Sequence, residues 1–204
     1  MPKKWYERVR TSRHLKVFNG AGVWSKHVLK AIDDFNGLPF NIVLDKEPDE
    51  NKADVVVILS DGKSTVYPRG GRKINGTTIT ANFDAAKTHG QAGSFLDSRD
   101  RISKVVIFLP EKLKDVPDEI KVLVVVHELI HSCGLVEKRD HDPVGGILSA
   151  TLQLFDGKLR EASTDKNLKG MPPIRVGGWT QCQIADLWKT SDDGKTLEEC
   201  IDDH

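Results

Sequence analysis

Long hydrophobic runs are missing from this sequence, and their absence excludes several classes of protein. No run approaches the roughly 18 apolar residues that a transmembrane helix needs, and the N-terminus has no apolar segment of the secretory type. Charge of one sign is not in excess either, because 30 lysines and arginines balance 30 aspartates and glutamates. The sequence therefore predicts no membrane span, leaves the compartment open between the cytoplasm and a larger assembly, and gives no oligomeric state.

Cysteine is scarce and the basic residues are unevenly spread. Three cysteines are too few for a disulfide framework, although a bridge between Cys182 and Cys200 remains an open alternative. Residues 1–13 are rich in lysine and arginine, and residues 191–204 form an acidic tail. We expect the first segment to be a solvated basic arm. Nucleic-acid binding through that arm is the weaker interpretation.

The hydrophobic pattern predicts a single α+β domain. At 204 residues the chain can form one sizeable core, or at most two small lobes that share a cleft. Short β-branched runs read as strands, and one segment has apolar residues at helical spacing before a glycine. Asn75 and Gly76 predict a hairpin, because both tolerate the positive φ of a tight turn. We expect strands at 14–18, 40–44, 54–59 and 103–109, helices at 23–35 and 180–188, and a second hairpin around Asp156 and Gly157.

A further helix, predicted for residues 118–133, contains the stretch HELIH. Pro117 suits the start of a helix, where its missing N–H is not needed, and Asp118 and Glu119 favour the positive end of the helix dipole. The β-branched run VLVVV before the motif would also suit a strand. The spacing within HELIH and the terminating Gly134 decide for a helix. We expect this helix to be apolar and buried.

His127 and His131 are four residues apart, so on a helix their imidazoles can reach one point. Neutral imidazole is a good ligand for Zn²⁺, and a catalytic zinc site keeps three protein ligands and one water. The metal lowers the pKa of that water to about 7, and a carboxylate beside it can take and return the proton. Glu128 is placed for that role. The sequence therefore predicts Zn²⁺ as cofactor, His127 and His131 as ligands, and Glu128 as the catalytic residue.

The stretch HELIHSCG at residues 127–134 resembles the HExxHxxG motif of the metzincin metallopeptidases. The order of expected elements is also similar: strand, helix, strands, active-site helix and C-terminal helix. The resemblance implies a zinc endopeptidase with a mixed, twisted sheet and two main helices in an upper subdomain, at about 14–134. It also implies an irregular lower subdomain with a C-terminal helix, at about 135–190. Outside the motif, the similarity is one of element order.

The third metal ligand is where this sequence departs from the family. Metzincins usually have a histidine three residues after the glycine, and this chain has Glu137 there. His141, seven residues after Gly134, needs a longer loop. We predict His141 as the ligand because the family prefers imidazole, with Glu137 and Asp140 as alternatives. Asp140 or Asp142 would then orient His141 through a hydrogen bond.

Metzincins also have a methionine in a tight turn beneath the metal. Met171 is the candidate, because Gly170 and the two prolines after it suit a rigid turn. A plain hydrophobic anchor at Met171 is the alternative, and Leu148 lies nearer the usual distance but lacks the sulfur. A second zinc class, the gluzincins, is resembled only by EASTD at residues 161–165, which shows no helical period.

These expectations describe a zinc-dependent metalloendopeptidase acting on a peptide or protein substrate. Zinc would polarise the scissile carbonyl, the bound water would attack, and Glu128 would move the proton to the leaving amine. The substrate would lie extended along an edge strand, for which we propose residues 103–109. The alternative is a non-catalytic metzincin-like module for binding or assembly, with or without the zinc. The departure at Glu137 and the lack of a tyrosine shortly after Met171 keep that alternative open.

Overall fold

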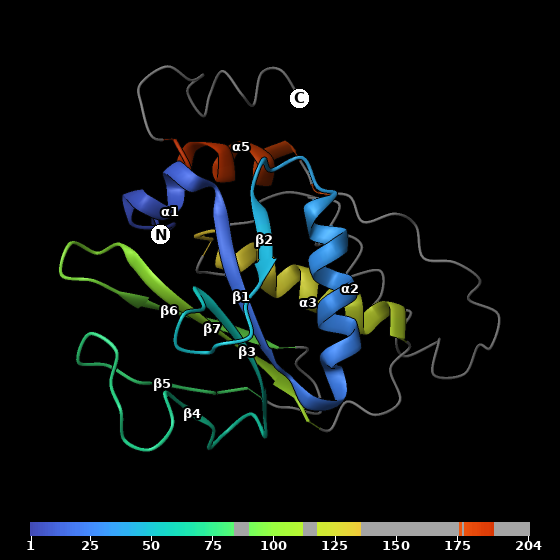
Figure 1. Ribbon diagram of the computed structural model, residues 1–204, viewed down its shortest axis with the longest axis vertical. Helices are drawn as coiled ribbons and strands as arrows, with labels where there is room; N and C mark the ends of the chain where they lie inside the picture. Colours follow the sequence, from blue (N-terminus) through green and yellow to red (C-terminus); the bar gives the residue numbers. More distant parts are fainter. Residues whose placement is uncertain (84–89, 112–117, 136–175, 177, 190–204) are drawn as a thin grey trace.

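The computed structural model describes residues 1–83, 90–111, 118–135, 176 and 178–189. Its centre is a mixed five-stranded sheet with the strand order β2-β1-β3-β7-β6 (Figure 1). Four strands are parallel, and β6 pairs antiparallel with β7 at one edge. The fold is therefore α+β, as the sequence predicts. The strands of this sheet are β1 (His14–Gly20), β2 (Val43–Lys46), β3 (Val55–Ser60), β6 (Gln91–Leu96) and β7 (Ile102–Pro110).

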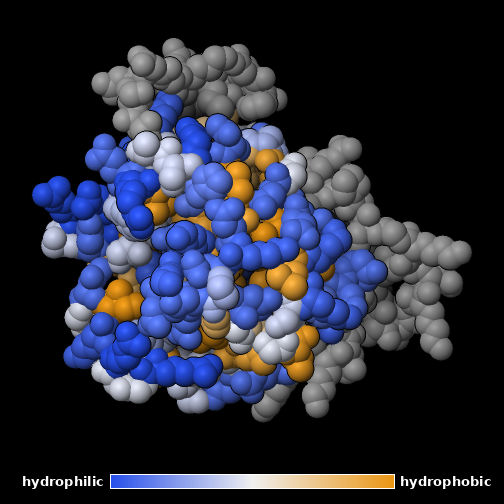
Figure 2. Space-filling model, viewed as in Figure 1, coloured by the Kyte–Doolittle hydropathy of each residue, from blue (hydrophilic) through white to orange (hydrophobic). Residues whose placement is uncertain are grey.

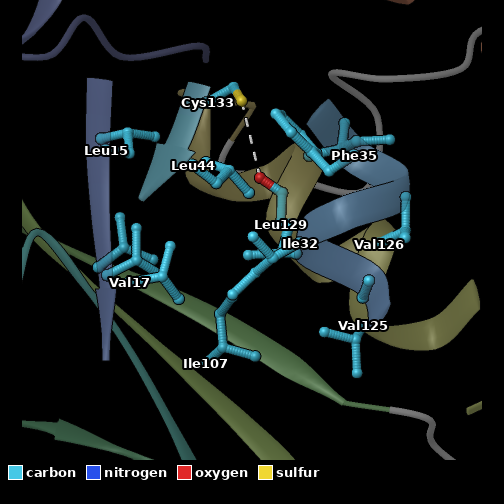
Figure 3. Packing of buried hydrophobic residues seen from close by; sticks show 14 of the residues in the cluster. Leu15, Val17, Ile32, Phe35, Leu44, Ile107, Val125, Val126, Leu129 and Cys133 are labelled. Atoms are coloured by element: carbon cyan, nitrogen blue, oxygen red, sulfur yellow. Dashed lines mark hydrogen bonds between the residues drawn. The ribbon is translucent and has the colours of Figure 1, made fainter. Parts of the chain in front are cut away.

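Two helices, α2 (Ser25–Asn36) and α3 (Asp118–Ser132), pack together over one face of the sheet. Figure 3 shows Val17 and Ile107 of the sheet facing Ile32 of α2 and Leu129 of α3, within one large buried cluster. Since both helices bury an apolar face against the same side of the sheet, α2 mainly over β1 and β2 and α3 mainly over β6 and β7, the position of α3 is set by the core. The short 3-10 helix η1 (Gly22–Trp24) leads into α2.

The opposite face of the sheet has a smaller core. Val56 and Ile58 of β3 point to this side and pack with Tyr67 and Phe95. The strands β4 (Val66–Tyr67) and β5 (Ile79–Thr80) form a separate antiparallel pair there. Because β3 is buried on both faces, its sequence is a continuous apolar run, as expected for a central parallel strand.

The α3 helix confirms the sequence interpretation despite its β-branched residues. Val124, Val125 and Val126 are fully buried, so α3 is apolar around most of its circumference and suits the interior. Gly134 has a φ of +115°, which L-residues rarely adopt, and it ends the helix as predicted. Tertiary burial thus outweighs the weak helical propensity of valine at these positions.

The N-terminal segment differs from the solvated arm that its charge predicts. Trp5 and Val9 are buried, and Trp5 forms a bridge with Ile102 of β7. A short helix, α1 (Glu7–Ser12), follows Trp5. The basic side chains remain at least partly exposed, but the segment itself is packed onto the domain. Two apolar anchors therefore decide its position, and the net charge of the segment does not.

Other expected elements are found with small shifts. The strands at 14–18, 54–59 and 103–109, the helix at 23–35 and the helix at 180–188 are all present, the last as α5 (Gly178–Leu187). Asn75 and Gly76 both have positive φ, and Ile74 and Thr77 exchange two backbone hydrogen bonds across that turn. The strand predicted at 40–44 starts later, at Val43. The hairpin around residue 156, the tail at 191–204 and most of the segment 135–190 lie outside the described residues.

The surface of the described residues is mainly polar on the face that Figure 2 presents. Figure 2 shows apolar residues as small, separated areas among hydrophilic ones on the face it presents. Within the described ranges, no helix combines the length and the apolar character that crossing a bilayer demands. Met1 and Val23 are the most exposed of the large apolar side chains described.

Candidate metal centre

The C-terminal half of α3 brings His127 and His131 together. Their Nε2 atoms lie 3.2 Å apart, and their rings meet edge to face with centroids 4.9 Å apart. His131 is buried and His127 is partly exposed. The sequence prediction that these two imidazoles converge is therefore confirmed for the pair.

The separation of the two nitrogens fits a shared metal ion. Zinc–nitrogen bonds of about 2.0–2.1 Å at a tetrahedral angle place two ligand nitrogens about 3.3 Å apart. The 3.2 Å between Nε2 of His127 and Nε2 of His131 is close to that value. Two neutral imidazoles at this spacing suit a borderline-soft divalent cation such as Zn²⁺. The donor chemistry of the pair thus fits the predicted cofactor.

The backbone beyond the helix sets the tautomer of His131. Nδ1 of His131 is hydrogen-bonded to the carbonyl oxygen of Leu135. Because a carbonyl oxygen only accepts hydrogen bonds, Nδ1 must carry the proton in this contact. In the neutral ring, Nε2 then keeps its lone pair and can act as a metal ligand. Leu135 therefore orients His131 in the manner typical of metal-binding histidines.

Glu128 lies against the start of β6. Its side chain is buried, and a Cβ built on Gly90 would lie 3.1 Å from both its Cγ and its Oε1. Gly90 thus leaves the space that the carboxylate occupies. Sequence reasoning missed this residue, since Gly90 belongs to no motif. Its only signal is that a glycine precedes a strand, and that does not identify its neighbour.

The remaining predicted site residues fall outside the described part of the chain. These are the third-ligand candidates Glu137, Asp140 and His141, Asp142 as a residue that would orient His141, and Met171 as the candidate for the methionine turn. Over the ranges that the structure describes, no group of three or more histidine, cysteine or acidic side chains is arranged to hold a metal. A third ligand for a metal on this pair would have to come from outside those ranges, and its identity stays a prediction.

Cys133, between His131 and Gly134, takes no part in the pair. Its thiol is fully buried and its Sγ donates to the carbonyl oxygen of Leu129, as Figure 3 shows. Burial in the apolar core raises the pKa of the Cys133 thiol well above its usual range. Since metals bind the thiolate form, Cys133 is unsuited to compete for the ion. Cys182 is disulfide-bonded, and Cys200 lies outside the described residues.

The edge strand next to the site is not the one expected. Residues 103–109 belong to β7, which lies between β3 and β6 inside the sheet. That prediction was wrong, because the apolar run of β7 reflects burial between two neighbouring strands. The described sheet has two edge strands, β2 and β6, and the one beside Glu128 is β6, which begins at Gln91, directly after Gly90.

The site thus combines three features. The Nε2 atoms of two histidines have a separation that fits a shared metal ion, and the buried carboxylate of Glu128 lies between these histidines in the sequence. An antiparallel edge strand starts beside that carboxylate. Comparison with protein-family models gives no match for this chain, and comparison with curated proteins gives none either.

Proposed function

We propose that this protein is a zinc-dependent metalloendopeptidase of metzincin type. The observation that carries the proposal is the 3.2 Å between Nε2 of His127 and Nε2 of His131, with Glu128 between them in the sequence. The mixed sheet, the two main helices, the glycine turn after α3 and the later helix α5 support a metzincin-like fold. His141 is our third ligand, with Glu137 and Asp140 as alternatives, and Met171 is our candidate beneath the metal.

The chain's own residues would carry out the proton transfers. Bound Zn²⁺ supplies Lewis acidity and lowers the pKa of a water molecule that it coordinates. Glu128 accepts a proton from the attacking water and then donates it to the nitrogen of the leaving amine. His127 and His131 would hold the ion through their Nε2 atoms.

The substrate would lie as an extended peptide along β6. An edge strand offers backbone N–H and C=O groups that a further strand can pair with, which is a common mode of peptide binding. A peptide in that position passes Gly90, where the Glu128 side chain meets the strand. Pairing along β6 would therefore bring a peptide bond to the carboxylate. This placement replaces the one proposed for residues 103–109.

A non-catalytic module with the same fold is the second candidate. The sequence feature that favours it is Glu137, which stands where the family usually has its third histidine. A module of this kind would bind a partner or assemble, with or without zinc. The two candidates differ in one measurable property, which is hydrolysis that depends on Glu128.

The test compares Glu128→Gln with the wild type and with Glu119→Gln, an exposed glutamate on the same helix. We expect about one zinc per chain in all three proteins, because a catalytic site of this type binds a single ion. Hydrolysis of an unstructured protein such as casein should fall by about 100-fold or more in Glu128→Gln only. Zinc without Glu128-dependent hydrolysis would favour the module, and no zinc in the wild type would contradict the peptidase and leave only a module without zinc.

A further inference from the structure

The end of α3 receives hydrogen bonds from distant parts of the chain. Four successive carbonyl oxygens, those of residues 132–135, each accept one bond. Nε1 of Trp5 donates to Ser132 at 2.7 Å, and Nε1 of Trp188 donates to Cys133 at 2.8 Å. The backbone N–H of Lys3 donates to Gly134 at 2.8 Å. The carbonyl of Leu135 accepts from His131.

These contacts take the place of the water molecules that usually hydrogen-bond to the carbonyl groups at the end of a helix. The last carbonyl groups of an α-helix have no partner inside the helix. Here Trp5 and Trp188 are each 1% exposed, so their bonds to the helix end are shielded from water. A hydrogen bond in such surroundings is stronger than one at the surface, and leaving one partner unpaired is correspondingly unfavourable. The two indoles therefore hold the backbone of residues 132 and 133 firmly.

The two indoles come from opposite ends of the described chain. Trp5 precedes α1, and Trp188 directly follows α5, and these helices lie side by side in Figure 1. The guanidinium of Arg10 links them, since its Nε donates to the carbonyl of Trp5 and its Nη1 to that of Lys189. The N-terminal segment and Trp188 after α5 thus both hydrogen-bond to the residues at the C-terminal end of α3.

We propose that Trp5 and Trp188 are positioning residues for the metal centre. They fix the carbonyl groups of residues 132 and 133, and thereby the turn through Gly134 that ends at Leu135. The carbonyl of Leu135 in turn keeps the proton of His131 on Nδ1 and its lone pair on Nε2. The importance of this for zinc rests on the proposed function, whereas the effect on the tautomer of His131 does not.

The experiment removes one N–H group at a time. Trp5→Phe and Trp188→Phe keep an aromatic ring but lose the donor. Trp24→Phe is the matched control, because Trp24 is also buried and its Nε1 donates to the carbonyl of Pro110 at 3.1 Å, away from the site. Urea unfolding of the metal-free proteins measures the general loss of stability, which we expect to be similar in all three variants.

Two further measurements separate positioning from stability. The ¹⁵N shifts of His131 in the metal-free full-length protein report which ring nitrogen carries the proton. We expect the Nδ1–H form to lose population in Trp5→Phe and Trp188→Phe and to persist in Trp24→Phe. Zinc affinity, measured against a chelator, should fall by about tenfold in the first two variants and stay within about twofold in the control, as for other residues that support metal ligands.

An unchanged tautomer of His131 in both tryptophan variants would overturn the proposal. An equal change in Trp24→Phe would also overturn it, because the effect would then follow stability alone. If the wild type binds no zinc, the proposed function fails, and the tautomer measurement still decides the role of the two indoles. If zinc binds but hydrolysis is absent, only the catalytic part of the proposed function fails.

Discussion

Oδ1 of Asp118, at the start of α3, lies 2.8 Å from Nε2 of His27 on α2. Nζ of Lys26 lies 2.6 Å from the other carboxylate oxygen. His27 is almost fully buried, whereas Asp118 is more than half exposed. The helix that presents the histidine pair is therefore tied to α2 at its beginning and to Trp5 and Trp188 at its end. Its position depends on both attachments.

The first prediction concerns the acid sensitivity of this attachment. The hydrogen bond from Lys26, followed by that from His27, lowers the pKa of Asp118 to about 2. A lowered pKa means that the carboxylate stabilises the fold above its unfolded pKa of about 4, and that this contribution disappears as the pH falls through about 2. Because Asp118 is exposed, the contribution should not exceed about 1 kcal/mol.

Asp118→Asn should therefore reduce the free energy of unfolding at pH 7, and the difference from the wild type should shrink between about pH 4 and pH 2. Urea unfolding across this range measures it. Lys26→Met removes the largest cause of the shift, so the pKa of Asp118 in that variant should rise, as followed by NMR titration. A difference that stays constant down to pH 2 would contradict the assignment.

The second prediction concerns the space beside the carboxylate. In Gly90→Ala the new methyl group would lie 3.1 Å from Cγ and Oε1 of Glu128, so the side chain must shift. A misplaced catalytic group can slow a reaction by about 100-fold for 1 Å of displacement. We expect hydrolysis to fall by about tenfold or more while zinc content is unchanged.

Gly37→Ala is the control, because its methyl group would meet the carbonyl of Asp34 at 3.3 Å, at the end of α2 and away from the site. That variant should keep the wild-type rate. If Gly90→Ala hydrolyses casein as fast as the wild type, the proposed position of Glu128 in the reaction is wrong.

The third prediction concerns the close approach of Lys3 to Gly134 at the end of α3. Gly134 has a φ of +115°, and a Cβ there would lie 2.3 Å from the carbonyl oxygen of Lys3. Gly134→Ala should lower the free energy of unfolding by about 3 kcal/mol or more. Gly70 has a positive φ of +69°, in the left-handed region, and a Cβ there would meet nothing within 4 Å, so Gly70→Ala should lose about 1 kcal/mol. Equal losses in urea unfolding would mean that the contact with Lys3 does not matter.

The fourth prediction identifies the third metal ligand. Three single variants, His141→Ala, Glu137→Ala and Asp140→Ala, are compared by zinc content after dialysis against a weak chelator. We expect only His141→Ala to lose most of its zinc, because removing one of three protein ligands weakens binding far more than removing a group that merely orients a ligand. If the loss follows Glu137→Ala, the oxygen ligand at the usual family spacing is the correct one.

The sequence predicts the histidine pair well because that geometry is local. Residues four apart on a helix face the same side, so His127 and His131 converge wherever the helix is placed. The central strand β3 can be predicted equally well, since a strand that is buried on both faces has an uninterrupted apolar sequence. Gly134 could be recognised because the end of a helix often needs a positive φ.

Contacts between distant segments could not be predicted in the same way. The strand β6 has the sequence QAGSFL, which is poor in β-branched residues, and its strand character comes from pairing with β7. The N-terminal segment looked solvated because its charges outnumber its two apolar anchors, Trp5 and Val9. The role of Gly90 beside Glu128 joins positions 38 residues apart, for which the sequence offers no spacing rule.

The bond from Trp188 to Cys133 also has a consequence for biosynthesis. A ribosome makes the chain from the N-terminus, so the histidine pair emerges while residue 188 is still to be translated. Until then, of the donors from distant segments, only Trp5 and Lys3 can hydrogen-bond to the residues at the end of α3. If Trp188 has the role proposed above, the nascent chain acquires its two histidines before the second indole that positions them, and we expect it to bind zinc more weakly than the finished protein does.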